Sequence, residues 1–449
     1  MELFGKLEQK TLEKAVLVHV DFYHSADQEV LAEFYELVDS AGAEVAELIS
    51  TKRDTPDAKF FVGKGKAEEI KAAVMTHQAD VVIVNHALSP AQERNLSQML
   101  ACQVLDRVGL ILDIFAQRAR SHEGKLQVEL AQLRRMSTRL VKGWSHLDRQ
   151  GGIGARGPGE TQLETDRRLL QAKIKQLEAR IEKVRKQRSL GRRSRQKSDY
   201  PTVTLVGYTN AGKSTLFNLL TQASVYAEDR LFATLDSTLR KVHLPGAGPI
   251  ILADTVGFIR HIPHDLVAAF RSTLEETREA DLLIHLVDAA DPHRSEKMAD
   301  VAEVIEEVKA SDVPQLTVFN KIDLMTKAAV EPHLDLNESG LPERVWLSAQ
   351  SQQGMPLLLE AIAAHFRGRF ITVRLTLAMH AGKRRSQLYQ LGTILKEGFD
   401  DQGNSEFEMC LTEQEWHQVQ RWKEVLMYKE VQQDTDNAGQ NEESSLSGD

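Results

Sequence analysis

The chain has 449 residues, of which 42% are hydrophobic and 6% aromatic, and a net charge of −9. This length favours several domains, and the composition is that of an ordinary soluble α/β protein. There is no run of 18 apolar residues, and the first residues lack the basic-then-apolar pattern of a signal peptide, so we expect a cytoplasmic protein without membrane insertion. The two cysteines, Cys102 and Cys410, lie far apart in the sequence, and they predict neither a disulfide framework nor a metal site.

The first region of the chain predicts an α/β domain over residues 10–120. Apolar, β-branched strands at 15–20, 44–49 and 81–84 alternate with helices at 27–41 and 67–77. This alternation predicts a parallel sheet. Residues 61–66 read Phe-Val-Gly-Lys-Gly-Lys before the second helix and could bind an anion. The segment lacks the full phosphate-loop spacing, however, which favours a turn followed by a helix start.

Residues 121–198 predict an antiparallel helical hairpin. One heptad seam is formed by Leu126, Leu130, Leu133, Leu140, Trp144 and Leu147. A second seam is formed by Leu170, Ile174, Leu177, Ile181 and Val184. The glycine-rich span 151–159 between them cannot be helical, so we expect two helices joined by a loop at their tip. At ~1.5 Å per residue, the first helix, 123–147, would be roughly 38 Å long.

The end of this hairpin is strongly basic. Residues 180–199 contain nine lysines and arginines against two acidic residues. Such a stripe can bind RNA phosphates even in a chain that is acidic overall. The alternative is a solvated helix face followed by a linker.

A phosphate-binding loop begins the next domain, which we place at 199–369. Residues 207–214 read G-Y-T-N-A-G-K-S between an apolar strand at 202–206 and a helix at 215–220. The glycines let the backbone curl so that its N–H groups face the phosphates. We expect Lys213 to reach the β- and γ-phosphates and the Ser214 hydroxyl to bind Mg²⁺. The motif predicts a nucleotide-hydrolysing domain of the Ras-like type.

A buried strand at 250–253 ends in Asp254-Thr255-Val256-Gly257. Asp254 would hold Mg²⁺ through water, and the Gly257 N–H would meet the γ-phosphate. The preceding segment, 231–240, would close over the metal, with Thr234 as its metal-binding hydroxyl. Thr238 is the alternative ligand, unless it begins the next strand.

Two further motifs predict the base and its pocket. A strand at 316–319 leads to Asn320-Lys321-Ile322-Asp323, and another at 344–347 leads to Ser348-Ala349-Gln350. The Asp323 carboxylate can accept two N–H bonds from guanine, whereas adenine offers neither donor there. A buried aspartate would therefore reject ATP. Each of these motifs follows a predicted strand. This is the arrangement of proteins that bind a nucleotide at the carboxyl edge of a parallel sheet.

The predicted nucleotide contacts are the residues of these motifs and of the segment between the first two of them: Gly207, Tyr208, Thr209, Asn210, Ala211, Gly212, Lys213, Ser214, Thr215, Phe232, Ala233, Thr234, Leu235, Asp236, Asp254, Thr255, Val256, Gly257, Asn320, Lys321, Ile322, Asp323, Ser348, Ala349 and Gln350. We assign catalytic roles to Lys213, Thr234 and Gly257. The predicted metal ligands are Ser214 and Thr234.

The C-terminal region, 370–428, predicts a small α+β domain. Strands are expected at 371–379 and 406–411, and helices at 383–397 and 413–425. The tail, 429–449, is polar, acidic and serine-rich, which predicts disorder.

The motifs together resemble those of the HflX family of ribosome-associated GTPases, related to the Obg-type GTPases. The resemblance rests on G-Y-T-N-A-G-K-S-T, F-A-T-L-D, D-T-V-G-F-I-R, N-K-I-D and S-A-Q, and on residues 61–66 and 151–166. It covers about residues 10–428. One departure is Ser237, where the family usually has proline, and this loosens the placement of the metal contact in that loop.

The resemblance implies a monomeric, Mg²⁺-dependent GTPase that binds the large (50S) ribosomal subunit and its rRNA. It implies that the hairpin tip reaches the peptidyl-transferase region, and that the protein splits or rescues stalled ribosomes under stress. Two alternatives stay open. The protein could be a nucleotide-gated assembly factor or scaffold with incidental hydrolysis, or its N-terminal domain could remodel RNA with ATP.

Two residues bear on the rate of hydrolysis. Ras-like enzymes carry a water-orienting glutamine after D-x-x-G, but this chain has Phe258 there. We therefore expect slow turnover alone and stimulation by the 50S subunit, unless the Thr234 backbone or His261 positions the water. In some related GTPases an asparagine at the position of Asn210 helps to bind K⁺, which makes K⁺ dependence a hypothesis here.

Overall fold

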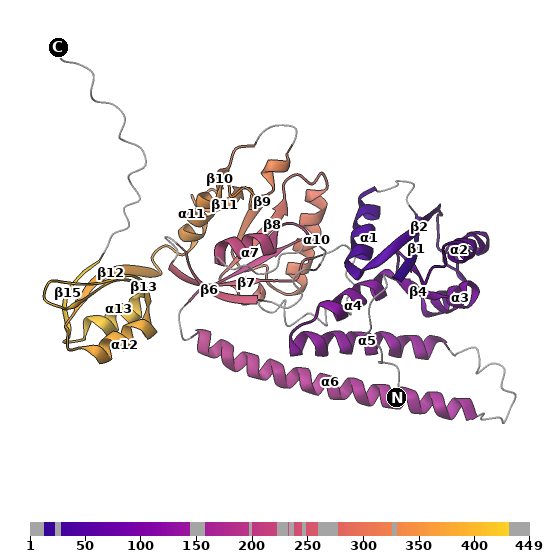
Figure 1. The fold of residues 1–449 in the computed structure, drawn as a ribbon, viewed down its shortest axis with the longest axis horizontal. Helices are drawn as coiled ribbons and strands as arrows, with labels where there is room; N and C mark the ends of the chain where they lie inside the picture. The colour runs from indigo at the N-terminus through magenta and orange to yellow at the C-terminus, as the bar shows by residue number, and fades with distance from the viewer. Residues whose placement is uncertain are drawn as a thin grey trace, which may run out of the picture.

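The computed structural model describes residues 13–22, 28–143, 158–196, 200–221, 232, 238–244, 248–258, 277–325 and 330–430. Figure 1 shows an N-terminal α/β part, a pair of long helices beneath it, a central part around a seven-stranded sheet, and a C-terminal sheet part at the opposite end of the molecule. The predicted multidomain α/β fold class is confirmed. None of the helices in the described ranges is long and apolar enough to cross a lipid bilayer.

The N-terminal part contains a four-stranded parallel sheet in the order β2-β1-β3-β4. Its strands are β1 (Glu13–Asp21), β2 (Ala43–Lys52), β3 (Val81–Val84) and β4 (Gln103–Asp106). Its helices are α1 (Gln28–Ala41), α2 (Lys64–His77), α3 (Pro90–Leu100) and α4 (Arg107–Arg118). The sheet is parallel, as the alternation predicts. The elements α3, β4 and α4 were not predicted from the sequence.

The glycine-basic segment at 61–66 forms a turn and the start of α2. Gly63 is the residue before α2 and has φ 88°, and the Arg53 Nη1 atom donates to the Val62 carbonyl at 3.1 Å. A Cβ at position 63 would lie 2.5 Å from that Nη1 atom. The space beside the turn is therefore filled by Arg53, as expected for a turn and helix start.

The two long helices are α5 (His122–Gly143) and α6 (Pro158–Gln196). They pack through the predicted seams, with a buried cluster and a partly buried fringe: Leu126, Leu130, Leu133, Leu177, Ile181, Leu170, Ile174 and Val184. The side chains of Leu140, Trp144 and Leu147, and residues 151–157 of the glycine-rich span, lie outside the described residues.

One expectation about this hairpin is wrong. The span 151–159 was expected to be non-helical throughout, but α6 begins at Pro158. Proline suits the first helical position because its fixed φ matches the helix and its missing N–H has no partner there anyway. At ~1.5 Å per residue, α6 is about 58 Å long. It runs through the basic stretch as far as Gln196, so most of that stretch is helix and not linker.

The central sheet has the order β10-β11-β9-β8-β5-β7-β6. Its strands are β5 (Thr202–Gly207), β6 (Thr238–Leu244), β7 (Gly248–Asp254), β8 (Leu282–Asp288), β9 (Gln315–Asn320), β10 (His333–Leu336) and β11 (Pro342–Trp346). The helices around it include α7 (Lys213–Thr221), α10 (Arg294–Glu307) and α11 (Met355–His365). Only the two edge strands, β6 and β10, run antiparallel to their neighbours. The five strands between them all end at the same edge.

The C-terminal sheet is antiparallel, in the order β13-β14-β12-β15. It is built from β12 (Phe370–Leu377), α12 (Gly382–Leu391), β13 (Thr393–Phe399), β14 (Ser405–Thr412), α13 (Glu413–Gln420) and β15 (Val425–Glu430). Both predicted helices were too long, because 393–397 and residue 425 belong to strands. A Cβ at Gly392 would lie 2.4 Å from the Leu411 Cδ2 atom, which marks where α12 ends.

Candidate nucleotide-binding site

The phosphate loop, residues 207–214, connects the end of β5 to the start of α7. Gly212 has φ 95°, which favours glycine, and a Cβ there would lie 2.3 Å from the Asn320 Nδ2 atom. The glycine is therefore needed both for the backbone curl and for close approach of the N-K-x-D loop. The curl directs backbone N–H groups and the N-terminus of α7 to one place, as a phosphate requires.

Lys213 lies beneath this loop and is 6% exposed. Its Nζ atom donates to the carbonyls of Gly207 at 3.0 Å and of Tyr208 at 2.7 Å. Burial lowers the pKa of Lys213 to about 8, and the charge of Asp254 opposes that decrease. A buried ammonium that donates to two carbonyls is well placed to gain from the charge of a phosphate.

Ser214 and Asp254 provide oxygen ligands suited to Mg²⁺. The Ser214 Oγ atom donates to the Asp254 Oδ2 atom at 3.2 Å, which joins the start of α7 to the end of β7. Mg²⁺ prefers oxygen ligands and is usually held by one or two side chains together with phosphates and water. Among the described residues, no cluster of three or more His, Cys, Asp or Glu side chains could hold a metal ion. The two residues fit a Mg²⁺ ion that the nucleotide helps to coordinate.

The D-x-x-G loop is hydrogen-bonded directly to the phosphate loop. The Thr209 N–H donates to the Phe258 carbonyl at 2.7 Å, and the Phe258 N–H donates to the Gly207 carbonyl at 3.1 Å. A Cβ at Gly257 would lie 2.7 Å from the Thr209 Cγ2 atom and 3.1 Å from the Lys213 Nζ atom. Only glycine therefore fits at the point where the two loops meet.

Asn320 connects three of the predicted motifs. Its Nδ2 atom donates to the Ala211 carbonyl at 2.9 Å, and its Oδ1 atom accepts the Ala349 N–H at 2.8 Å. The side chain is 2% exposed, so these bonds are made away from water. One buried amide thus holds the phosphate loop, the N-K-x-D loop and the S-A-Q loop together.

Asp323 lies in a single 3-10 turn, Ile322–Leu324, just beyond β9. The sequence predicted a buried aspartate, but this residue is exposed. The turn projects past the end of the strand, so burial of the carboxylate would have to come from the base itself. Lys321, beside it, has φ 65° and its Nζ atom bonds the Asp288 Oδ2 atom at 2.8 Å.

The remaining predicted residues differ in their burial. Phe232 is 2% exposed and its ring lies 4.6 Å from that of Phe115 in α4, centroid to centroid. Thr215 and Gln350 are exposed, whereas Thr255, Val256, Ile322 and Ser348 are buried. Ala233, Thr234, Leu235, Asp236 and His261 lie outside the described residues. Thr238, the alternative metal ligand, begins β6 and pairs with Asp254 across the sheet.

Two residues of β8 that line the site, His285 and Asp288, were not predicted from the sequence. His285 is 6% exposed, and burial, assisted by the charge of Lys213, lowers its pKa to about 4. It is therefore neutral at pH 7. The signal available was the apolar run of 282–288, which reads as a buried strand ending in aspartate at the same sheet edge.

Three family models match successive parts of the chain. Residues 28–116 match the family described as GTP-binding GTPase N-terminal, residues 118–195 the GTP-binding GTPase middle region, and residues 202–321 the 50S ribosome-binding GTPase family. GTPase HflX of Escherichia coli strain K12 is 54% identical over 416 residues, covering 92% of this chain and 97% of that protein. GTPase HflX of Caldanaerobacter subterraneus subsp. tengcongensis is 45% identical over 394 residues, covering 88% of this chain and 90% of that protein.

A crystal structure of a GTP-binding protein from Sulfolobus solfataricus in complex with GDP is 25% identical, with a TM-score of 0.44, and the match covers 79% of this chain and 99% of that one. The family does not depend on this likeness, because the curated relatives already span almost the whole sequence at high identity. The phosphate loop, the hydroxyl and carboxylate for Mg²⁺, and the amide that joins the base loops all lie at one sheet edge of a chain that belongs to the HflX family of GTPases and hydrolyses GTP.

Proposed function

We propose that this GTPase acts on the large (50S) ribosomal subunit and its rRNA, and that it splits or rescues stalled ribosomes under stress. The observation that carries the proposal is the α5–α6 hairpin, a long two-helix arm on a nucleotide-hydrolysing domain. The match of residues 202–321 to a family described as 50S ribosome-binding GTPases supports it. We further propose that the protein works as a cytoplasmic monomer.

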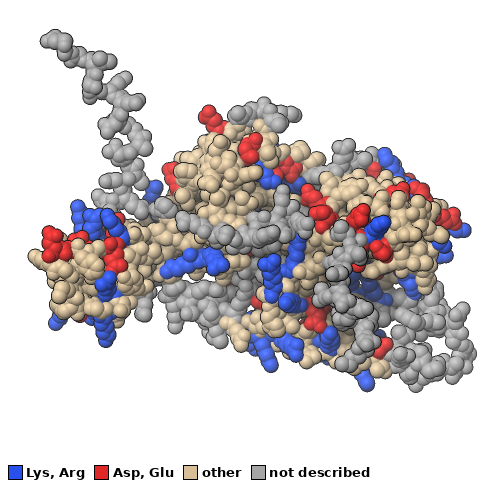
Figure 2. All heavy atoms as spheres, in the orientation of Figure 1, with Lys and Arg blue, Asp and Glu red and all other residues tan. Residues whose placement is uncertain are grey.

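The charge of α6 supports RNA as the partner. Over 165–187 the helix carries eight lysines and arginines against three acidic residues. Arg180, Lys183 and Lys186 are exposed, and Figure 2 shows Lys and Arg side chains along the lower edge of the molecule where α6 lies. Phosphates are bound by such side chains with the release of counterions.

The first experiment measures cosedimentation of the protein with 50S subunits in a non-hydrolysable GTP analogue and in GDP, over a salt series. We expect tighter binding with the GTP analogue, because a GTPase cycle works only if the two nucleotide states differ in affinity. Replacement of Arg180, Lys183 and Lys186 by glutamate should weaken binding and reduce the salt dependence by about two to three units of the log–log slope. The matched control places the same charge change on exposed Lys59, Lys64 and Lys71. Equal binding in both nucleotides, or an equal effect of both triple variants, would contradict the proposal.

Splitting requires its own assay. Intact ribosomes incubated with the protein and the GTP analogue should separate into subunits on a sucrose gradient, and Lys213→Ala should fail to separate them. Binding to 50S subunits without loss of intact ribosomes would leave the protein as an assembly factor or scaffold.

We propose that GTP and Mg²⁺ are held by the residues predicted from the sequence, with Ser214 and Thr234 as the side-chain ligands of the metal. The hydroxyl–carboxylate pair of Ser214 and Asp254 supports the first ligand. When bound, Mg²⁺ would neutralise charge on the β- and γ-phosphates. Thr234→Ala should raise the Mg²⁺ concentration needed for half-maximal hydrolysis, whereas Thr238→Ala, at the start of β6, should not. The reverse order would assign the second ligand to Thr238.

We also propose that Asn210 gives the enzyme a K⁺ dependence. Asn210 lies in the phosphate loop with φ 61°, and its Nδ2 atom donates to the Glu36 Oε2 atom at 2.9 Å. Hydrolysis compared in equal KCl and NaCl tests this. Equal rates would eliminate K⁺ as a cofactor.

A further inference from the structure

The face of α1 that meets the phosphate loop carries two carboxylates. The Glu33 Oε2 atom accepts a hydrogen bond from the Tyr208 hydroxyl at 2.6 Å, and the Glu36 Oε2 atom accepts one from the Asn210 Nδ2 atom at 2.9 Å. A spacing of three residues puts both carboxylates on one side of the helix. Both acceptors therefore come from the N-terminal domain, and both donors belong to the phosphate loop.

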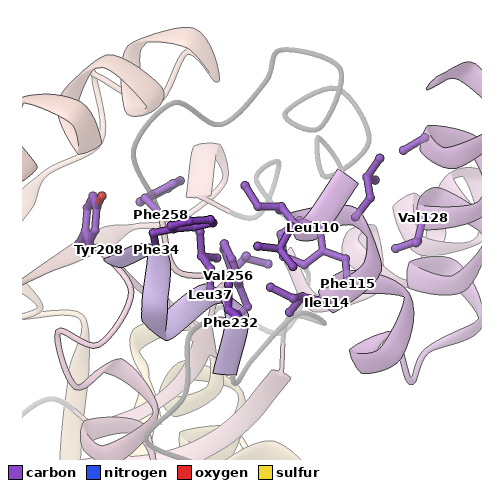
Figure 3. Close-up of a cluster of buried hydrophobic side chains, with 14 of the residues drawn as sticks. Phe34, Leu37, Leu110, Ile114, Phe115, Val128, Tyr208, Phe232, Val256 and Phe258 are labelled. Atoms are coloured by element: carbon purple, nitrogen blue, oxygen red, sulfur yellow. The ribbon is translucent and has the colours of Figure 1, made fainter. Parts of the chain in front are cut away.

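The same helix covers the D-x-x-G loop with apolar side chains. Phe34 and Leu37 are fully buried in a cluster that contains Val256 and Phe258. Phe232, two residues before Thr234, lies in the same cluster with residues of α4. Figure 3 shows these side chains between Tyr208 on one side and Leu110, Ile114 and Phe115 of α4 on the other. The N-terminal domain therefore contacts the phosphate loop and the residues beside both predicted γ-phosphate-sensing segments.

Glu33 is fixed from the N-terminal side as well. Its Oε1 atom pairs with the Arg107 guanidinium at the start of α4, and the side chains are 11% and 10% exposed, respectively. The Arg107 Nη1 atom also donates to the Asn85 Oδ1 atom at 2.8 Å, at the end of β3. A largely buried, charge-assisted bond of this kind is stronger than an ordinary surface contact. Glu33 thus joins Tyr208 to the carboxyl edge of the N-terminal sheet.

Helix α1 places two carboxylates beside the phosphate loop. A cavity of about 400 Å³ lies between α1, the phosphate loop and α10. Glu33, Glu36, Asp288 and Asp291 line it together with Arg294, Lys297 and Lys321, and Lys297 pairs with Asp291 while Lys321 pairs with Asp288. The phosphate loop must accept the negative charge of the nucleotide in this neighbourhood. GTP carries one more phosphate than GDP, so repulsion by the Glu33 and Glu36 carboxylates weakens GTP binding more than GDP binding.

We propose that Glu33 and Glu36 are positioning residues for the phosphate loop, through which the N-terminal domain lowers the affinity for GTP relative to GDP. Because coupling between two binding events is reciprocal, GTP in turn loosens the contact of α1 with the loop. The proposal goes beyond the ribosomal role and rests only on the GTPase activity. It is tested without ribosomes, so its failure and that of the proposed function are separate results.

The experiment measures the dissociation constants of a fluorescent non-hydrolysable GTP analogue and of fluorescent GDP for the full-length protein. The double variant Glu33→Gln and Glu36→Gln should lower the ratio of the GTP-analogue constant to the GDP constant by about fivefold. The control, Glu44→Gln, makes the same type of charge change at an exposed position of β2 and should leave the ratio unchanged. An equal change in both affinities, an unchanged ratio or a higher ratio would overturn the proposal.

Two further measurements separate positioning from folding. Glu36→Gln alone keeps the Glu33–Arg107 pair intact, and it should move the ratio in the same direction by a smaller factor. Hydrogen exchange of the wild-type protein should show faster exchange in α1 with the GTP analogue than with GDP, while α2 is unaffected. If α1 exchanges at the same rate in both nucleotides, GTP does not loosen the contact and the proposal is wrong.

Discussion

Phe258 contributes structure at a position where related enzymes place a catalytic side chain. Its ring is 4% exposed within the cluster under α1, and its backbone N–H and carbonyl both bond the phosphate loop. A side chain held in this way does not reach an attacking water. The residue therefore keeps two loops together, and the group that orients the water must come from elsewhere, which is consistent with a low rate for the protein alone.

Base selection is the property most directly tied to one residue, Asp323. Asparagine at this position keeps an acceptor but adds an N–H₂ donor, which would face the donors of guanine. Xanthine has a carbonyl in place of the 2-amino group, and it can accept from that donor. We expect Asp323→Asn to weaken GTP binding by about 100-fold and to improve binding of xanthosine triphosphate. Competition of the two nucleotides against fluorescent GDP measures this, and a variant that still prefers GTP would show that Asp323 does not read the base.

The pKa of Lys213 predicts a pH dependence of nucleotide binding. With a pKa of about 8, the ammonium loses its proton in the free protein as the pH rises through 8. The phosphates favour the charged form, so binding above pH 8 requires uptake of a proton and becomes weaker. We expect the affinity for GTP to fall about tenfold between pH 7 and pH 9. Lys213→Met should bind more weakly at every pH, and its affinity should not show this fall. An affinity that is flat from pH 7 to pH 9 in the wild-type protein would contradict the assignment.

At the scale of elements, the loops of the site are held in register by buried side-chain bonds as well as by the sheet. The amide of Asn320 satisfies the Ala211 carbonyl and the Ala349 N–H at once. Backbone groups left without partners in a protein interior cost free energy, so this amide matters for stability as well as for nucleotide binding.

We therefore expect Asn320→Ala to lower the free energy of unfolding by about 2–4 kcal/mol, because two buried backbone groups lose their partners. Asn320→Asp is the matched variant. Its carboxylate still accepts from Ala349, but it does not donate to Ala211. Urea unfolding of the nucleotide-free protein measures both. If the two variants lose equal stability, the bond to Ala349 contributes little.

The loops could be predicted from sequence because each motif specifies a local backbone shape and follows a strand. The boundaries of the helices and strands in the C-terminal domain could not be predicted in this way. Residues 393–397 were expected to be helical, yet they form β13, because pairing with β14 outweighs local propensity. The contact of α1 with the phosphate loop also could not be predicted from the sequence. In the sequence Glu33 and Glu36 look like ordinary charges on an amphipathic helix, and only the docking of two domains gives them partners.

For the whole molecule, the arrangement of the arm depends on its attachment to the N-terminal domain. Asp106, the last residue of β4, is 1% exposed and caps α4 by accepting from the Gly109 N–H at 2.8 Å. The same carboxylate pairs with Arg135 at 2.5 Å and with Arg139 at 3.2 Å, both from α5. Glu93 of α3 completes the network, and burial raises its pKa above the ordinary value. Charges desolvated together hold α5 in a defined direction, because moving any one of them leaves the others buried and unpaired.

The apolar seam between α5 and α6 holds the two helices of the arm side by side. Ile181 of α6 is 6% exposed in this seam, whereas Leu169 of the same helix is 61% exposed. Ile181→Asp should detach α6 from α5 at a cost of about 2–5 kcal/mol, because it removes buried apolar surface and puts a charge in its place. Leu169→Asp introduces the same charge where nothing packs, and it should leave the arm intact. Limited proteolysis of residues 158–196 measures the detachment.

The same pair of variants separates the arm from the GTPase site. Ile181→Asp should abolish cosedimentation with 50S subunits while the affinity for GTP stays within about twofold of wild type, because the seam lies outside every loop that forms the nucleotide site. Leu169→Asp should retain both properties. If Ile181→Asp still sedimented with 50S subunits after proteolysis had shown α6 to be detached, the arm would not be the ribosome-binding element, and recognition would have to lie in the other domains.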